Sequence, residues 1–309
     1  MTKASPFSGS PAPRYRGRFA PTPSGPLHLG SLLTALASFL EARRQAGSWL
    51  LRIDDLDTTR VDAASETRIL KQLEAHGLFW DEAPRRQSEH RDEYADALNS
   101  LDRRELVYAC ECTRAVLAQN SLPGPDGAVY NGACRQRKLA PDGRSLRLRM
   151  PDQSLQFVDA SQGAQSRRLD IDLGDFVVRR RDGIFGYQLA CAVDEHAQRI
   201  TEVVRGADLL SSTFFQIHLM HQLRLQVPHY RHLPVLASPG DRKLSKQNHA
   251  RAIEESSAAA NLHLCLELLG QTPAPALRRA QVPELIAWAQ AHWRVENVPR
   301  RPILVINIL

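Results

Sequence analysis

Residues 18–31 read Arg-Phe-Ala-Pro-Thr-Pro-Ser-Gly-Pro-Leu-His-Leu-Gly-Ser, and they place a histidine and two glycines before an apolar helical pattern that runs to about Ala46. The prolines, Gly25 and Gly30 are typical of a strand-to-helix crossover. A helix that opens near Ser31 would offer unpaired N–H groups and a positive dipole end, which favour phosphate. His28 would point to the same place. The stretch predicts a phosphate site, although His-x-Gly alone also fits an ordinary proline-rich turn.

A second cationic segment, Lys243-Leu244-Ser245-Lys246, follows His28 after about 215 residues. Two lysines and a hydroxyl suit the charge that builds on a polyphosphate in a transition state. The motif is weak alone, because basic surface loops are common.

Three acids, Asp54, Asp55 and Asp57, directly follow the apolar run 49–53. The run is typical of a buried parallel strand. Because ligands lie beyond the carboxyl ends of such strands, we expect these acids to reach the crevice that contains His28. A calcium loop fits poorly, since the glycine and distal glutamate of an EF-hand are missing. A solvated helix entry remains an alternative.

Cys110, Cys112 and Cys134 lie in a short segment rich in Gly and Pro. Thiolates clustered in this way select zinc. No histidine lies between positions 90 and 196 to complete the usual ligand set, and three independent thiols remain the alternative. Cys191 and Cys265 fall in apolar stretches and are expected in the core.

Arg205 ends an apolar stretch and is followed by Gly206. The guanidinium offers a rigid fork of donors that suits a carboxylate ligand. An internal salt bridge to Asp208 or Asp194 is the alternative. His218 and His221, three residues apart in an expected helix, have no third ligand nearby, and we assign them no metal.

Taken together, these segments resemble the class I aminoacyl-tRNA synthetases, specifically their glutamyl and glutaminyl branch. Residues 18–25 and 28–30 are similar to the first signature of that family, and 243–247 to its second, Lys-Met-Ser-Lys-Ser, with Leu244 and Gln247 as departures. Residues 52–57 are similar to Arg-Ile-Glu-Asp-Thr/Ile-Asp, with Asp54 in place of Glu. The resemblance covers roughly residues 14–300.

A truncated branch of the glutamyl family shares the spacing Cys-x-Cys, then Tyr-x-x-x-Cys, in which the tyrosine is a zinc ligand. By resemblance, the structural zinc ligands are therefore Cys110, Cys112, Tyr130 and Cys134. The resemblance implies that glutamate is bound by Arg18, Phe19, Ala20, Pro21, Thr22, Asp54, Tyr187 and Arg205. It implies that ATP is bound by His28, Gly30, Lys243, Ser245 and Lys246, with His28 and Lys246 as the catalytic residues.

The activity implied by the resemblance is the formation of glutamyl-adenylate from L-glutamate and ATP, with Mg²⁺ accompanying ATP. Residues 251–309 are too few for the anticodon-binding domain of full-length glutamyl-tRNA synthetases. The resemblance to the truncated branch therefore implies transfer of glutamate to queuosine in the anticodon of tRNA(Asp). A minimal glutamyl-tRNA synthetase that acts on the tRNA 3′ end, or a non-catalytic tRNA-binding module, are the alternatives.

The elements that must position these residues form an α/β fold with a Rossmann-like class I catalytic domain. We expect this domain to comprise residues 14–108 and 145–250, interrupted by a zinc-binding insertion at 109–144. Residues 145–178 alternate in the manner of strands that rejoin the catalytic sheet. A flexible leader at 1–13 and an all-helical C-terminal domain at 251–309 complete the expected organisation.

The chain has 309 residues, of which 24% are charged, and a net charge of +6. The positive charge suits a polyanionic partner such as tRNA. Five cysteines and a leader without an apolar core indicate a reducing, cytoplasmic compartment. No apolar run approaches the roughly 20 residues of a membrane span. We expect a monomer.

Overall fold

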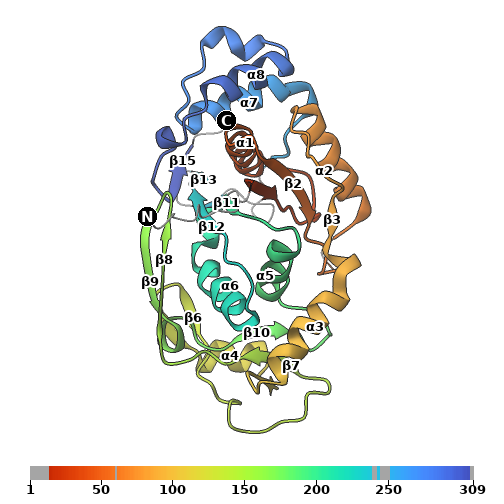
Figure 1. The fold of residues 1–309 in the computed structure, drawn as a ribbon, viewed down its shortest axis with the longest axis vertical. Helices are drawn as coiled ribbons and strands as arrows, with labels where there is room; N and C mark the ends of the chain where they lie inside the picture. The colour runs from red at the N-terminus through yellow and green to blue at the C-terminus, as the bar shows by residue number, and fades with distance from the viewer. Residues whose placement is uncertain (1–13, 60, 239–241, 244–250, 307–309) are drawn as a thin grey trace, which may run out of the picture.

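The computed structural model describes residues 14–59, 61–238, 242–243 and 251–306. Two sets of parallel strands lie side by side at the centre of the molecule (Figure 1). The first set is β1 (Arg16–Phe19), β2 (Ser48–Ile53) and β3 (Arg85–Arg86), and the second is β11 (Glu202–Gly206) and β12 (His229–Leu233).

The two sets meet between β1 and β11. Thr201 donates its N–H to the carbonyl of Arg16 at 2.9 Å, and the Arg18 side chain contacts the carbonyl of Val204, so the strands run in the same direction. The resulting order, β3-β2-β1-β11-β12, is that of a Rossmann sheet. Its strand order reverses between β1 and β11, and a crevice for ligands is expected at the carboxyl ends of these two strands.

Helices cover the sheet and connect its strands. They are α1 (Leu29–Arg44), α2 (Ala63–Ala75), α3 (Arg91–Asp102), α5 (Tyr187–Ala197) and α6 (Leu210–Leu223). Strand β2 is buried on both sides because its residues alternate between two cores. Trp49 and Leu51 pack in the core that contains α1, whereas Leu50 packs with Phe214 of α6. This explains why the strand is a continuous apolar run.

The expectation that residues 145–178 rejoin the catalytic sheet is wrong in part. Two of the strands pair with β4 in a separate antiparallel sheet of order β10-β7-β4, which packs beneath α3 and α5. Only the β8–β9 hairpin reaches the parallel strands, through the pairing of Asp159 with Tyr230. These elements are β4 (Val107–Cys110), β7 (Ser145–Leu148), β8 (Ser154–Asp159), β9 (Gly163–Arg168) and β10 (Phe176–Arg179).

Between β4 and β7 the chain forms a small excursion with a short helix and a hairpin. Its elements are α4 (Arg114–Asn120), β5 (Leu122–Gly124) and β6 (Gly127–Val129). Because Cys110 and Ser145 are register partners, β4 and β7 hold together the two ends of this segment.

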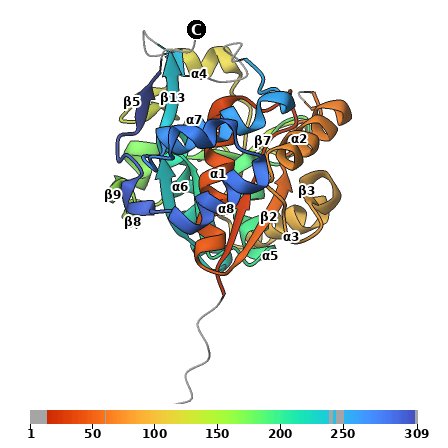
Figure 2. The ribbon, with the colours of Figure 1, turned by 90° about the horizontal axis from the view of Figure 1, so that it is seen from above.

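The C-terminal segment begins with α7 (Ala258–Leu268) and α8 (Val282–His292), which lie against α1 (Figures 1 and 2). Trp293 donates its indole N–H to the buried Glu41 of α1 at 2.9 Å. The expectation of an all-helical tail is wrong at β15 (Ile303–Val305), which pairs in parallel with β13 (Val235–Ser238). Strand β13 also pairs with β14 (Arg242–Lys243).

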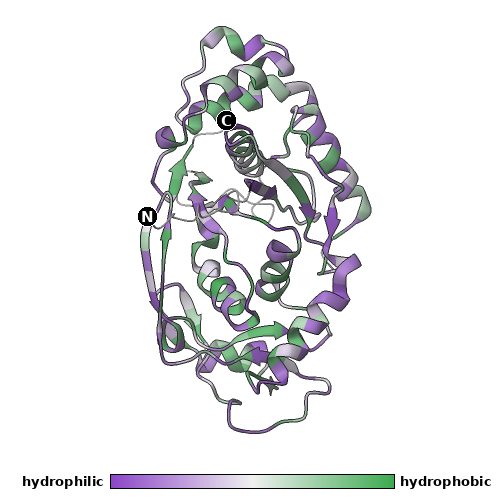
Figure 3. Ribbon diagram, viewed as in Figure 1, coloured by the Kyte–Doolittle hydropathy of each residue, from purple (hydrophilic) through white to green (hydrophobic). Residues whose placement is uncertain are grey.

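Hydropathy follows this packing. In Figure 3, hydrophilic and hydrophobic stretches alternate along α2, which buries only Ile69, Gln72 and Leu73, whereas β10 is largely hydrophobic. Within the described residues, no helix combines the length and hydrophobicity needed to cross a membrane.

Candidate active site

His28 is the N-cap of α1. Its backbone is extended, and its Nδ1 accepts the N–H of Ser31 at 3.3 Å. The helix therefore begins at Leu29, two residues earlier than expected, because the histidine side chain satisfies a first-turn N–H group. Gly30 lies within the first turn, and Gly25 has φ of 140°, a conformation that favours glycine. His28 thus lies at the positive end of the helix dipole, beside the carboxyl end of β1.

Gln72 of α2 fixes the segment that leads to His28. This buried side chain accepts the N–H of Leu27 at 2.8 Å and donates to the carbonyl of Ile253 at 2.8 Å. The backbone of Ile253 in turn donates to Leu27 at 3.0 Å. The chain on the C-terminal side of the second lysine-rich segment is therefore held next to the first glycine-rich one.

Of the second segment, Ser245 and Lys246 lie outside the described residues. Lys243 is described by its backbone alone, in β14, opposite Ala237 of β13. The leader 1–13 also lies outside the described residues.

A charged floor lies on the face of the sheet toward α5. Arg18 Nε donates to both carboxylate oxygens of Glu195, at 2.9 and 3.0 Å, and Arg52 Nη1 donates to Glu195 at 3.2 Å. Arg52 also forms a two-pronged pair with Asp54, at 2.7 and 3.3 Å. All four side chains are at least nine-tenths buried. Two arginines and two carboxylates thus balance one another.

Strand alternation explains why these charges gather on one face. Leu50 packs toward α6, so Arg52, two residues later in β2, faces the same way, and Arg18 is the register partner of Leu50. Burial by itself would raise the pKa of Glu195, but the charges of Arg18 and Arg52 outweigh burial and hold this pKa below its ordinary value.

Asp54 keeps unshared capacity although both of its oxygens already accept from Arg52. A carboxylate has about four acceptor positions, so an ammonium group can share it. The neighbouring acids point elsewhere: Asp55 accepts from Ser88 at 2.6 and 2.8 Å, and Asp57 pairs with Arg180 at 3.1 Å. This separation also argues against a shared calcium site.

Arg205 is buried beside this floor and has a different set of partners. Its guanidinium donates to His232 Nε2 at 3.0 Å, Gln216 at 2.8 Å, Thr213 at 2.8 Å and the carbonyl of Leu209 at 3.2 Å. Among the described residues it forms no ion pair, and Asp194 instead pairs with Arg85 at 2.8 Å. The expected alternative of a salt bridge to Asp208 or Asp194 is therefore not what the described chain shows.

Tyr187 is the first residue of α5, and 41% of it is exposed. It lies within electrostatic range of both Arg205 and Asp54, so its ring borders the same crevice. The loop after β1 is tied to the loop after β2, since Asp54 donates its N–H to the carbonyl of Pro21 at 3.0 Å.

The remaining residues expected at glutamate differ in exposure. The Phe19 ring packs against Trp49 in the core that contains α1, so only its backbone is free to contact a ligand. Ala20 and Thr22 are partly exposed and Pro21 is buried.

The expected zinc residues come together in a compact cluster. The sulfurs of Cys110, Cys112 and Cys134 lie within 4.8 Å of one another, and all three cysteines are free thiols. Cys112 Sγ lies 3.5 Å from Cys134 Sγ, while the Tyr130 hydroxyl lies 3.5 Å from Cys110 Sγ and 3.7 Å from Cys112 Sγ. Bond lengths of about 2.3 Å to sulfur and 2.0 Å to oxygen give tetrahedral edges of roughly 3.5 to 3.8 Å. The four side chains therefore fit one tetrahedral metal ion.

The chemistry of the donors agrees with this geometry. Burial by itself would raise the pKa of Cys134, but hydrogen bonds from the Glu111 backbone, Tyr130 and Cys112 lower it to about 7. The Arg147 guanidinium lies 3.9 Å over the Tyr130 ring, which favours negative charge on the phenol. His218 is buried and His221 exposed, so the two do not form a shared site.

Sequence reasoning missed several residues that support the site. Glu195 lies two turns after Tyr187 on the same face of α5, a helical spacing that could have identified it. His232 is the register partner of Arg205, and Asp159 is brought to both by β8. Those pairings join distant parts of the chain, and no local pattern announces them.

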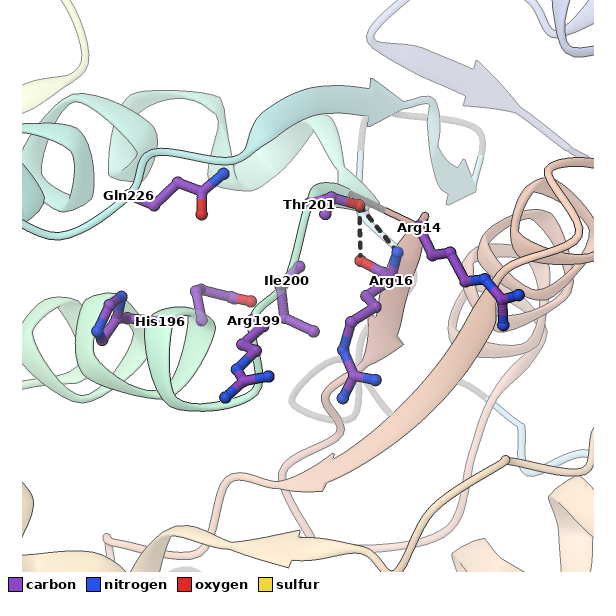
Figure 4. A pocket seen from close by; sticks show the side chains of 8 residues that line it. Arg14, Arg16, His196, Arg199, Ile200, Thr201 and Gln226 are labelled. Carbon is purple, nitrogen blue, oxygen red and sulfur yellow. Dashed lines mark hydrogen bonds between the residues drawn. The ribbon is translucent and has the colours of Figure 1, made fainter. Parts of the chain in front are cut away.

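A cavity of about 420 Å³ lies at the other edge of the sheet (Figure 4). Its lining includes Arg16, which begins β1, and Arg199 and Thr201, which precede β11. The cavity is therefore at the amino ends of the strands, away from His28 and Asp54. Arg16 is already held by Glu82, at 2.6 and 3.0 Å, and we assign the cavity no role in the crevice.

A Rossmann sheet with a histidine-capped helix at its switch point and a buried, unpaired arginine beside it is the arrangement of a class I synthetase. The catalytic-domain model of the tRNA synthetases class I (E and Q) matches residues 14–269, and the chain belongs to this family.

Individual relatives narrow the comparison. Proteins named Glutamyl-Q tRNA(Asp) synthetase from Pseudomonas fluorescens and Methylococcus capsulatus are 44% and 47% identical to this chain. The matches cover 95% and 94% of this chain, and 97% and 95% of those proteins. The crystal structure of a glutamate-tRNA synthetase from Elizabethkingia anophelis matches with a TM-score of 0.77 at 26% identity. That match covers 96% of this chain and 68% of the longer protein.

Proposed function

We propose that this chain is a ligase that activates L-glutamate with ATP and transfers it to queuosine in the anticodon of tRNA(Asp). The names of relatives that match almost end to end support the acceptor. The observation that carries the choice of amino acid is Arg205, a buried cation with neutral partners among the described residues. Glutamate has a net negative charge, and Arg205 complements it where the floor below is already balanced.

The proposed roles follow from position. Arg205 and Arg18 bind the carboxylates of glutamate, Tyr187 borders the bound molecule, and Asp54 accepts from its ammonium group. Phe19, Ala20, Pro21 and Thr22 supply the wall between β1 and α1. Positioning of the glutamate carboxylate for attack on the α-phosphorus of ATP supplies much of the rate enhancement in such reactions.

His28, Gly30 and the N-terminal end of α1 bind the phosphates of ATP, with Lys243, Ser245 and Lys246 completing the site. Lys246 stabilises the charge that develops as the bond to pyrophosphate breaks. Mg²⁺ enters with ATP and neutralises part of the phosphate charge. The queuosine hydroxyl then attacks the adenylate carbonyl, and AMP leaves.

We also propose that one structural Zn²⁺ is held by Cys110, Cys112, Tyr130 and Cys134, whose separations fit a tetrahedral shell. The metal would stabilise the excursion between β4 and β7, at residues 109–144. A closed shell of four protein ligands leaves no position for substrate. We expect a cytoplasmic monomer in which residues 14–108 and 145–250 form the catalytic domain and 251–309 form the C-terminal one.

Two measurements test the function. The first is ATP–pyrophosphate exchange, which we expect to depend on glutamate and not to require tRNA. The second is transfer of labelled glutamate to tRNA(Asp) with and without queuosine. We expect transfer only to the modified tRNA and to its isolated anticodon stem-loop, and we expect it to survive removal of the tRNA 3′ end.

The outcomes separate the alternatives. Glutamate found on the 3′ terminal adenosine of tRNA(Glu) would identify a minimal glutamyl-tRNA synthetase. Binding of tRNA without any exchange would identify a non-catalytic binding module.

A further inference from the structure

We propose that His232 is a positioning residue for glutamate: as a neutral imidazole with its proton on Nδ1, fixed by Asp159, it sets the orientation of the Arg205 guanidinium. The inference rests on the proposed function, since it takes Arg205 as the cation that binds a carboxylate of glutamate. Nothing in the sequence motifs assigns a role to His232 or Asp159.

The hydrogen-bond pattern determines which nitrogen carries the proton. Arg205 Nε can only donate, so His232 Nε2, at 3.0 Å, must accept. The proton of the neutral ring therefore lies on Nδ1, which donates to Asp159 Oδ2 at 2.6 Å. Asp159 Oδ1 also accepts the backbone N–H groups of Ser161 and Gln162, at 2.9 and 2.8 Å, which hold the carboxylate in place.

The surroundings keep the ring neutral. His232 is completely buried and 1% of Asp159 is exposed. Burial lowers the pKa of His232, and the positive charges of Arg205 and Arg18 act in the same direction, against the pull of Asp159. A second ring proton would place an N–H group against the Arg205 guanidinium. The Tyr230 ring, 6.1 Å away and nearly parallel, restricts rotation of the imidazole.

The fold brings the three groups together on neighbouring strands. Arg205 of β11 and His232 of β12 are register partners, and Asp159 ends β8, which pairs with β12. The chain of contacts thus runs straight across the sheet from Asp159 through His232 to Arg205.

The arrangement limits how Arg205 can bind a ligand. Four of the five guanidinium N–H groups are used by His232, Gln216, Thr213 and the Leu209 carbonyl. Within the described chain, one N–H on Nη1 has no acceptor, and it is the donor offered to a carboxylate. Without the bond to Nε the guanidinium could rotate, and that donor would no longer have a fixed direction.

A matched pair of substitutions tests the role. In His232→Gln the side-chain amide lies where Nε2 was, so its oxygen can accept from Arg205. In His232→Asn the amide lies where Nδ1 was, so it reaches Asp159 and leaves Arg205 Nε without its acceptor. We expect His232→Asn to raise the KM for glutamate about tenfold or more, the scale of one hydrogen bond to a charged group. We expect His232→Gln to stay within about threefold, and the KM for ATP to be unchanged in both.

His263 provides the control, because it is also a buried histidine but bonds a backbone carbonyl, that of Ala274, at 3.3 Å. Its Gln and Asn variants should leave the KM for glutamate unchanged. Equal KM values in His232→Gln and His232→Asn would overturn the proposal. Independently of any variant, ¹⁵N NMR of the intact protein should show His232 protonated on Nδ1, and protonation on Nε2 would also overturn it. Loss of the proposed function is distinct, since it would appear as parental protein without glutamate-dependent exchange.

Discussion

Individual charges decide what the crevice can bind. Beneath α5, Arg18 and Arg52 are matched by Glu195 and Asp54, and this buried network contributes no net charge. Arg205 lies outside the balance, because its partners in the described chain are neutral. A buried cation without an anion is costly unless a ligand supplies one. The apo site is therefore incomplete, and a carboxylate completes it.

Replacement of Arg205 by leucine tests that view. The variant should lower kcat/KM for glutamate by on the order of 10² to 10³, because a carboxylate that loses its buried partner costs about 3 to 5 kcal/mol. The KM for ATP should stay near the parental value. Exchange kinetics at varied glutamate and ATP provide the measurement, with Arg16→Leu at the other edge of the sheet as the matched control. A normal KM for glutamate in Arg205→Leu would show that the arginine serves the fold alone.

At the scale of whole elements, the sequence predicts much of what matters. The apolar run of β2, the crossover into α1 and the strand that ends at Arg205 all have local patterns, and they appear where expected. The pairing of β11 with β12 does not have such a pattern, since register depends on which strands meet. The partnership of Arg205 with His232 was therefore beyond reach. Phe19 shows the same limit, because the family motif does not reveal which face of β1 its ring occupies.

The excursion between β4 and β7 provides a prediction about metal. Purified protein should contain about one zinc per chain, the stoichiometry of a single four-ligand site. The double variant Cys112→Ala, Cys134→Ala should contain none, whereas Cys265→Ala, which removes a buried thiol elsewhere, should keep its zinc. Elemental analysis after extensive dialysis measures both. Undiminished zinc in the double variant would rule out this site.

Helix α6 provides a prediction about acid. Burial, assisted by the nearby His221, lowers the pKa of His218 to about 4. In the unfolded chain the pKa is about 6.5, so between these values the unfolded state binds more protons than the folded one. The free energy of unfolding should therefore fall as pH drops from about 6.5 to 4, by about 3 kcal/mol from this residue.

Urea unfolding at pH 7 and pH 5 measures the effect. His218→Leu should weaken the loss of stability on acidification, and the same substitution at the exposed His229 should not. If both variants lose stability in parallel with the parental protein, His218 is not the group that titrates.

Across the whole molecule, the C-terminal segment and the catalytic sheet share one core. Residues from α1, β2, α7 and α8 pack together, and Trp293 reaches Glu41 on α1. Strand β15 adds a second connection, because Val235 and Ile306 exchange backbone bonds of 2.9 Å with Pro302 and Ala237. The segment that follows β13 carries Lys243 and Lys246.

A variant that ends at Pro302 should therefore lower the kcat of pyrophosphate exchange, by about tenfold if a few backbone hydrogen bonds to β13 are lost. Its zinc content should be unchanged. The double variant Ile303→Lys, Val305→Lys is the control, since both side chains are exposed and the backbone pairing can persist. Parental exchange in the shortened chain would show that β15 has no influence on the phosphate segment.

The position of β15 also determines how the protein should be handled under load. Because β15 and β13 are parallel, tension applied beyond residue 306 would shear their hydrogen bonds and act on the strand that leads to Lys243. Arg14 and β1 begin at the opposite edge of the sheet, far from that strand in the direction of the chain. An affinity tag, a surface anchor or a fusion partner placed before Arg14 would leave the crevice unstrained, whereas the same attachment after residue 306 would pull on its phosphate side.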